Sequence, residues 1–142
     1  MGKAKMTATE LERMAIEEVP FAGNMGIKFV EVGEGYVVAT LPYQDDFIRP
    51  GGTIAGPVMM AMADLVLWGV VMSQLGPVKL AVTTNLNINF LRRPTPGELT
   101  AVGQNLKLGQ RLAIGEVSLL TGGKDGDLVA HVTGTYSVPP RS

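Results

Sequence analysis

One carboxylate stands inside an otherwise apolar stretch of the sequence. Asp64 lies within residues 59–68, and its neighbours three and four positions away are all apolar: Met60, Ala61, Leu67 and Trp68. Burying a charged carboxylate there is costly unless it is hydrogen-bonded or placed at a functional pocket. Asp64 is therefore a candidate general base or nucleophile, and either role needs a polar contact that offsets the apolar setting. The structural alternative is an Asp bonded to a partner's backbone at a subunit interface.

The loop that leads to Asp64 is rich in glycine. Residues 49–57 read RPGGTIAGP, and the closing Gly-Pro pair predicts the start of a helix. The first amides of a helix carry a partial positive charge and can hold an anion or a developing oxyanion. The glycines could instead serve only to turn the chain. The loop and Asp64 together are more specific than either feature alone.

Several chemistries are excluded by residue type. The chain has no cysteine and one histidine, so thiolate nucleophiles, disulfides and two-histidine metal sites are absent. No serine lies in a G-x-S-x-G turn, and neither glycine-rich phosphate-loop pattern occurs. His131 falls in the middle of a predicted strand, where a structural role is expected. The sequence predicts no metal and no bound cofactor.

The elements that position these residues follow from periodicity and turn residues. Helices are predicted at 7–19, where Thr7 or Thr9 is the cap and Pro20 the end, and at 57–74. Strands are predicted at 25–32, 36–42, 79–91, 98–107, 109–120 and 128–138, with a polar loop at 43–55. We expect the last four strands to form an antiparallel meander.

Within the predicted strand at 79–91, side chains alternate between two faces. The alternation puts Leu80, Val82, Leu86, Ile88 and Phe90 on one face and Thr83, Asn85, Asn87 and Asn89 on the other.

Composition indicates one globular domain. The 142 residues are 46% hydrophobic and 18% charged, with a net charge of -1, which excludes general disorder and general nucleic-acid or membrane-surface binding. The longest apolar run, residues 58–72, is expected to be too short for a membrane span. A helix that is apolar on nearly every face must be wrapped on several sides, which predicts an α+β fold with a curved antiparallel sheet around it.

Four segments make the sequence resemble one family. Residues 51–64, read GGTIAGPVMMAMAD, resemble the helix entry of hotdog-fold acyl-CoA thioesterases of the PaaI-like type. Residues 85–94, 109–112 and 129–136 look like the later strands of that family. The resemblance covers roughly residues 20–139 and implies the hotdog fold, a curved antiparallel β-sheet wrapped around a long central helix. We expect a single domain over 1–142, with an N-terminal helical segment at 1–20 and the hotdog core at 21–139.

The resemblance also implies roles for individual residues. Asp64 matches the family's catalytic carboxylate and Gly56 its oxyanion-hole glycine, which implies hydrolysis of an acyl-CoA thioester to free acid and CoA. The family's motif histidine falls on Ala55, its second glycine falls on Pro57, and Arg49 stands where many relatives have Asn. Candidate substrate contacts are Arg49, Gly52, Pro57, Trp68, Asn85, Arg92, Arg93, Lys107 and Arg111, with the basic side chains available for the CoA phosphates. CoA is expected only as part of the substrate.

Two other functions remain open at this point. Loss of the motif histidine and second glycine is compatible with a non-catalytic acyl-CoA or acyl-ligand binder. A hotdog enoyl-CoA hydratase or dehydratase is less favoured. Those enzymes resemble this fold but use an active-site histidine, and His131, in the last predicted strand, is too far along the chain to take that place.

Helix geometry predicts an assembly. Gly56 and Asp64 are eight residues apart, or about 12 Å along one helix at about 1.5 Å per residue. A base and an oxyanion donor must each come within about 3 Å of one reacting group. Two antiparallel helices across a twofold axis satisfy this, so we expect an obligate homodimer with shared sites. The resemblance implies further pairing into a homotetramer, and a cytoplasmic location is expected by default.

Overall fold

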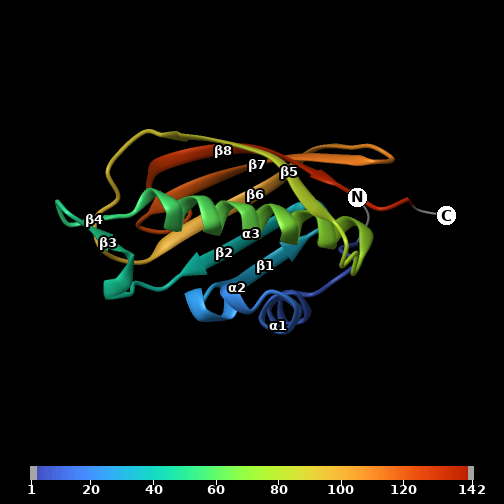
Figure 1. Ribbon diagram of the computed structural model, residues 1–142, viewed down its shortest axis with the longest axis horizontal. Coiled ribbons are helices and arrows are strands. Elements are labelled where there is room, and N and C mark those ends of the chain that lie inside the picture. The colour runs from blue at the N-terminus through green and yellow to red at the C-terminus, as the bar shows by residue number, and fades with distance from the viewer. Residues whose placement is uncertain (1–2, 141–142) are drawn as a thin grey trace.

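A curved antiparallel sheet wraps around one long helix in the computed structural model, which describes residues 3–140 (Figure 1). In chain order the elements are α1 (Ala8–Glu18), α2 (Pro20–Met25), β1 (Lys28–Gly33), β2 (Tyr36–Leu41), the 3₁₀ helix η1 (Asp45–Phe47), β3 (Ile48–Arg49), β4 (Thr53–Ile54), α3 (Gly56–Leu75), β5 (Val82–Phe90), β6 (Leu99–Leu108), β7 (Leu112–Thr121) and β8 (Asp127–Ser137). The predicted α+β architecture is confirmed.

The strand order corrects the predicted meander. The main sheet runs β1-β2-β6-β7-β8-β5, and β3 and β4 form a separate two-stranded ribbon. β6 pairs with β2, whereas β5 lies at the far edge beside β8. Alternation within a strand shows which face it buries, but it does not specify which strand lies beside it.

Glycines on the inner face of the sheet let α3 lie close to it. A Cβ added to Gly103 would lie 2.6 Å from Val66 Cγ1, and one added to Gly134 would lie 2.5 Å from Leu67 Cδ1. A Cβ on Gly115 would lie 2.8 Å from Leu67 Cδ2. Side chains of α3 therefore occupy the space that these three positions leave, and the centre of α3 is packed tightly against β6, β7 and β8.

α3 is longer than its apolar run suggested. By length and composition alone its 20 residues are enough to cross a membrane, although its longest apolar run, residues 58–72, is shorter. In the folded domain, 67% of its most apolar window is buried. This burial is that of a core helix enclosed by its own sheet.

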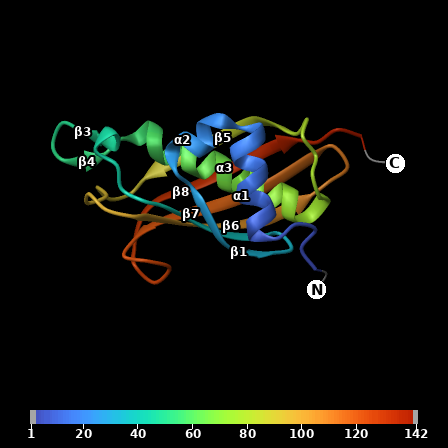
Figure 2. The ribbon, with the colours of Figure 1, turned by 90° about the horizontal axis from the view of Figure 1, so that it is seen from below.

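The N-terminal helix forms as its cap predicts. Thr7 Oγ1 accepts from Glu10 N at 3.1 Å, and Thr7 N donates to Glu10 Oε1 at 2.9 Å, which completes a capping box. Pro20 follows the end of α1 and also opens α2, a short helix that the pattern did not predict, so β1 begins at Lys28. Seen from below, α1 and α2 lie together, and α1 packs on β1 (Figure 2).

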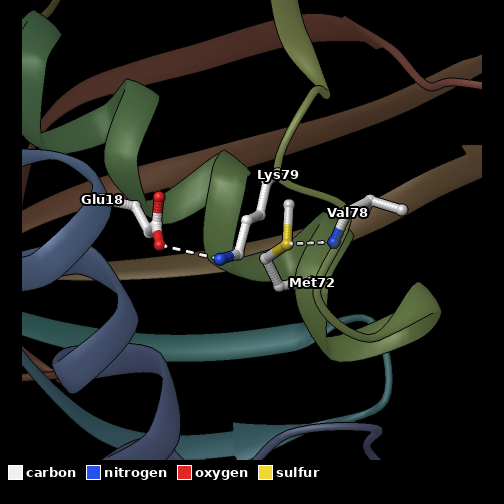
Figure 3. A network of polar contacts seen from close by, with 4 residues as sticks. All are labelled: Glu18, Met72, Val78 and Lys79. Carbon is white, nitrogen blue, oxygen red and sulfur yellow. Dashed lines mark hydrogen bonds and ion pairs between the residues drawn. The ribbon is translucent and has the colours of Figure 1, made fainter.

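The segment after α3 is tied to α1. Lys79 Nζ donates to Glu18 Oε1 at 2.9 Å, and Val78 N donates to Met72 Sδ at 3.3 Å (Figure 3). These contacts hold the chain where it leaves the helix and turns into the edge strand β5.

A β-bulge changes the faces of β5. Its pairing with β8 shifts between Thr83 and Asn85, and an extra residue there reverses the alternation. Thr83 consequently reaches α3, although the pattern assigned it to the opposite face from Leu86. Val82 and Leu80, predicted to share a face with Leu86, are 58% and 79% exposed.

Candidate active site

The carboxylate of Asp64 is held by two hydroxyl groups. Thr83 Oγ1 donates to Asp64 Oδ1 at 2.7 Å, and the Tyr136 hydroxyl lies 2.6 Å from the same oxygen. The Tyr136 hydroxyl is also 2.9 Å from the main-chain carbonyl of Asp64. These are the polar contacts that an ionised carboxylate in an apolar helix requires.

Tyr136 comes from the sheet that faces α3. Its side chain is 5% exposed, and it lies on β8. Burial, the charge of Asp64 and the hydrogen bond to it all raise the pKa of the Tyr136 phenol far above its ordinary value. The phenol therefore remains a neutral hydrogen-bond donor toward Asp64.

Sequence reasoning assigned neither Tyr136 nor Thr83 to the site. Tyr136 lies on the buried face of β8, but its partner Asp64 is 72 positions away in sequence. The signal available was a polar tip on an otherwise apolar face, since a buried phenol needs a hydrogen-bond partner. Thr83 was assigned to the wrong face because the bulge was not foreseen.

Gly56 is the first residue of α3, one position earlier than predicted. The preceding residue, Ala55, provides no side-chain cap, and its carbonyl accepts from Val58 N and Met59 N. Within the described residues, no hydrogen bond occupies the Gly56 amide. A Cβ on Gly56 would lie 3.2 Å from Phe90 Cζ, so the glycine leaves room for that ring.

A groove of about 560 Å³ opens at the start of α3. We call it the arginine groove, and its lining residues are Arg49, Pro50, Gly51, Thr53, Ile54, Gly56, Met59, Phe90, Leu91, Arg92, Arg93 and Pro94. Three arginines and no acidic residue line it, so it favours an anion, although Arg92 Nη1 also lies 3.3 Å from Asp127 Oδ2 in an exposed ion pair. Four predicted site residues therefore meet here: Arg49, Gly56, Arg92 and Arg93.

Local hydrogen bonds fix both sides of the arginine groove. Leu91 N and Arg92 N both donate to Val129 O, at 2.9 and 3.2 Å, which anchors the chain where β5 ends. Ala55 N donates to Phe47 O at 2.7 Å and ties the loop to the helix start. This loop was predicted as irregular, but it contains η1 and the β3–β4 ribbon that carries Arg49.

The other predicted substrate contacts lie apart from the arginine groove. Trp68 is buried in the core, and its ring centroid is 6.3 Å from that of Phe29. Asn85 is exposed on β5, on the face opposite to Leu86. Lys107 lies near the end of β6 and Arg111 just before β7, whereas Arg92 and Arg93 follow the opposite end of the sheet.

Two predicted substrate contacts, Gly52 and Pro57, adjoin groove residues in sequence but lie outside its lining. Gly52 lies in the β3–β4 turn with a φ of +75°, a backbone conformation that favours glycine. Pro57 occupies the first turn of α3. Neither lines the groove as described above.

The described part of the chain offers no obvious metal site. No group of three or more His, Cys, Asp and Glu side chains is arranged there to hold a metal ion. His131 instead contacts Glu116, with Nε2 2.8 Å from Oε1.

Comparison with known proteins agrees with this architecture. The family model of the thioesterase superfamily matches residues 51–126. A candidate thioesterase from a Silicibacter species is 34% identical, with 97% of this chain and 95% of that chain covered and a TM-score of 0.86. A variant of the phenylacetic acid degradation protein PaaI of Thermus thermophilus is 26% identical, with 83% and 97% covered and a TM-score of 0.74.

A curated relative supports the same assignment. A candidate esterase of Saccharolobus solfataricus is 29% identical over 129 residues, which covers 87% of this chain and 90% of that protein. The chain therefore belongs to the thioesterase superfamily and has its hotdog fold, with PaaI among its structural neighbours.

Proposed function

We propose that this hydrolase of the thioesterase superfamily cleaves an acyl-CoA thioester to the free acid and CoA. The observation that carries the proposal is the hydrogen-bonded carboxylate of Asp64 in the middle of the buried helix α3. A carboxylate at an apolar position costs stability unless it is hydrogen-bonded, so its presence there together with two hydroxyl donors supports a chemical role.

Asp64 has two possible roles in the reaction. As general base, it removes a proton from water while the water oxygen attacks the thioester carbonyl, and the C–S bond then breaks as the CoA thiolate leaves. As nucleophile, its oxygen attacks the carbonyl, the C–S bond breaks as the CoA thiolate leaves, and the resulting anhydride is hydrolysed by water to the free acid and the Asp64 carboxylate. Both roles use the ionised carboxylate, which the two hydroxyl donors stabilise.

The Gly56 amide is the proposed oxyanion donor. It stands at the positive end of α3 and has no hydrogen-bond partner among the described residues. Negative charge that develops on the thioester oxygen would be stabilised there.

The active site is proposed to form between two protomers. Gly56 and Asp64 lie on one straight helix, eight positions and about 12 Å apart, so one protomer cannot bring both to a single carbonyl. β5 is an edge strand whose neighbourhood exposes Val82, Phe90 and Leu91. A twofold pairing of this face would cover that surface and bring Gly56 of one protomer toward Asp64 of its partner. Further pairing of dimers into a homotetramer is part of the proposal, as is a cytoplasmic location.

The arginine groove is the proposed site for the CoA phosphates. Arg49, Arg92 and Arg93 line it beside Gly56, so a bound nucleotide would direct its thioester end toward the helix start. Lys107 and Arg111 lie at the other end of their own sheet. They could meet the same CoA molecule only from the partner protomer. Gly52, Pro57, Trp68 and Asn85 remain proposed substrate contacts.

A non-catalytic acyl-CoA binder is the second candidate. Ala55 and Pro57 occupy the positions of the family's motif histidine and second glycine, and this change favours binding without turnover. The hydratase alternative gains no support, because His131 is paired with Glu116 rather than directed at Asp64.

A panel of short, medium and aromatic acyl-CoAs separates these candidates. We expect at least one thioester to be hydrolysed, with release of free thiol, and the bound CoA ester to be detectable by calorimetry. Binding without thiol release across the panel would favour the binder.

A further inference from the structure

We infer that Tyr136 is a positioning residue, which fixes one oxygen of the Asp64 carboxylate so that the other remains available for reaction. The inference rests on the proposed function, because it assigns the reacting oxygen of the same site. Tyr136 itself would not touch the substrate.

The phenol of Tyr136 contacts two oxygens of Asp64. Its single hydroxyl lies 2.6 Å from Asp64 Oδ1 and 2.9 Å from the Asp64 carbonyl oxygen. Both oxygens belong to one residue, so a fixed phenol defines where that side chain lies relative to its own backbone. Tyr136 is itself held firmly, since it is 5% exposed in a strand with neighbours on both sides.

The two carboxylate oxygens of Asp64 differ in their hydrogen bonds. Oδ1 accepts from both Thr83 and Tyr136, whereas Oδ2 accepts no hydrogen bond from any described residue. An oxygen with two short charge-assisted bonds is a poor base and a poor nucleophile. The geometry points to Oδ2 as the atom that attacks or that takes the proton from water.

The phenol of Tyr136 has no acid–base role. Burial and the neighbouring Asp64 carboxylate raise the pKa of Tyr136, so its proton stays on the phenol throughout the reaction. Tyr136 therefore donates a constant hydrogen bond and does not transfer its proton.

The test is the Tyr136→Phe variant, which removes one oxygen and keeps the ring. Loss of a hydrogen bond to a charged group is expected to lower kcat about tenfold or more, while KM for the acyl-CoA changes little. Combined with Asp64→Asn, the same change should lower the residual rate no further. Tyr36→Phe is the matched control, because that ring lies near Lys124 and its hydroxyl makes no hydrogen bond to Asp64.

Three outcomes decide the inference. An unchanged kcat in Tyr136→Phe, with Asp64→Asn inactive, would overturn the positioning role and leave the proposed function intact. An equal loss in Tyr36→Phe would also overturn it, since the effect would then be general. If the wild-type protein hydrolyses no thioester, the proposed function fails, and a crystal structure of Tyr136→Phe decides the positioning role: Asp64 should occupy a new or divided position, and an unmoved carboxylate contradicts the inference.

Discussion

At the scale of single residues, the candidate site depends on how the charge of Asp64 is stabilised within the apolar helix α3. Asp64 has Thr83 and Tyr136 on one side of its carboxylate, and both donate to the same oxygen. Two hydroxyl donors provide part of the stabilisation that water would give, and they do so in a fixed direction. The described residues therefore hydrogen-bond one carboxylate oxygen and provide no donor to the other, which is the oxygen proposed to react.

The setting of Tyr136 predicts a pH dependence of stability. Its pKa is raised in the folded protein above the ordinary value of 10.0, so above that pH the unfolded chain loses a proton that the folded chain keeps. The stability that this phenol contributes is fully present below pH 10 and is lost as the pH rises. Relative to Tyr136→Phe, wild-type protein should lose about 1.4 kcal/mol of unfolding free energy per pH unit above 10. Urea unfolding of both proteins checks this, and parallel curves would refute it.

If the arginine groove binds the CoA phosphates, a change in it should affect KM for acyl-CoA but not for a thioester that lacks the nucleotide. Arg93→Ala removes one cation from the proposed phosphate site and should raise KM for an acyl-CoA by about tenfold, because a charge-assisted hydrogen bond is lost. An acyl-pantetheine thioester lacks the nucleotide and its phosphates, so its KM should not change. Lys124→Ala is the control, since Lys124 pairs with Glu31 away from the groove. Equal effects on both substrates would show that the groove does not bind the nucleotide.

Residue types predicted which chemistry was possible better than they predicted which atoms meet. The isolated Asp64 and the need for a polar partner were read from its apolar neighbours, and Thr83 and Tyr136 satisfy that need. The identity of those partners depended on which strands lie against α3, 19 and 72 positions away from Asp64, and local spacing does not specify that arrangement. Trp68 was expected to contact the substrate one turn from Asp64; its ring packs against Phe29 in the core, and the substrate contact stays a prediction.

At the scale of elements, the position of the site depends on how closely α3 lies to the sheet. Leu67 fits against Gly115 and Gly134 on neighbouring strands, and Val66 fits against Gly103. This close packing brings β8 near enough for Tyr136 to reach Asp64. It also fills the space between α3 and these strands with side chains of the protein itself.

Gly134→Ala is expected to destabilise the protein by about 1–3 kcal/mol, because its new methyl group would overlap Leu67. The added Cβ would be 2.5 Å from Leu67 Cδ1 and 3.2 Å from the Asn85 carbonyl oxygen. Gly33→Ala is a matched control, since its nearest contact would be an ordinary 3.8 Å and its effect should stay within about 0.5 kcal/mol. Denaturant unfolding measures both, and an unaffected Gly134→Ala would show that α3 is not packed this closely.

Elements were easier to predict than their arrangement. Turn residues and alternation located the six main strands and α3 to within a few positions. Three features had no local signal strong enough: the helix α2 after Pro20, the bulge in β5, and the pairing of β5 with β8. Several strands with a similar alternating pattern could have paired with β5, and the packing of the whole sheet decides that β8 does.

At the scale of the whole molecule, the proposed reaction requires more than one chain. The helix start with its arginine groove and the Asp64 carboxylate occupy different positions along α3, and each protomer carries one of each. A twofold dimer would therefore contain two equivalent sites, each built from two chains.

Complementation tests this shared site. Asp64→Asn removes the carboxylate charge, and Gly56→Pro removes the oxyanion amide at a helix position that accepts proline, after an Ala55 already in an extended conformation. Each homodimer should be inactive. A mixed dimer would carry one site with both defects and one intact site, so activity should return to about half of the wild-type level per dimer. Verified heterodimers that remain inactive would show that each site belongs to one chain.

The most direct test of the central claim is the rate of acyl-CoA hydrolysis by Asp64→Asn beside wild-type protein. This change deletes the charge and keeps the size of the side chain, so the fold and the binding of the CoA ester should persist. The proposed role of Asp64 predicts that thioester hydrolysis falls by at least about a hundredfold, as expected on loss of a base or nucleophile. Hydrolysis near the wild-type rate by the folded variant would contradict the assignment of Asp64 as the catalytic carboxylate.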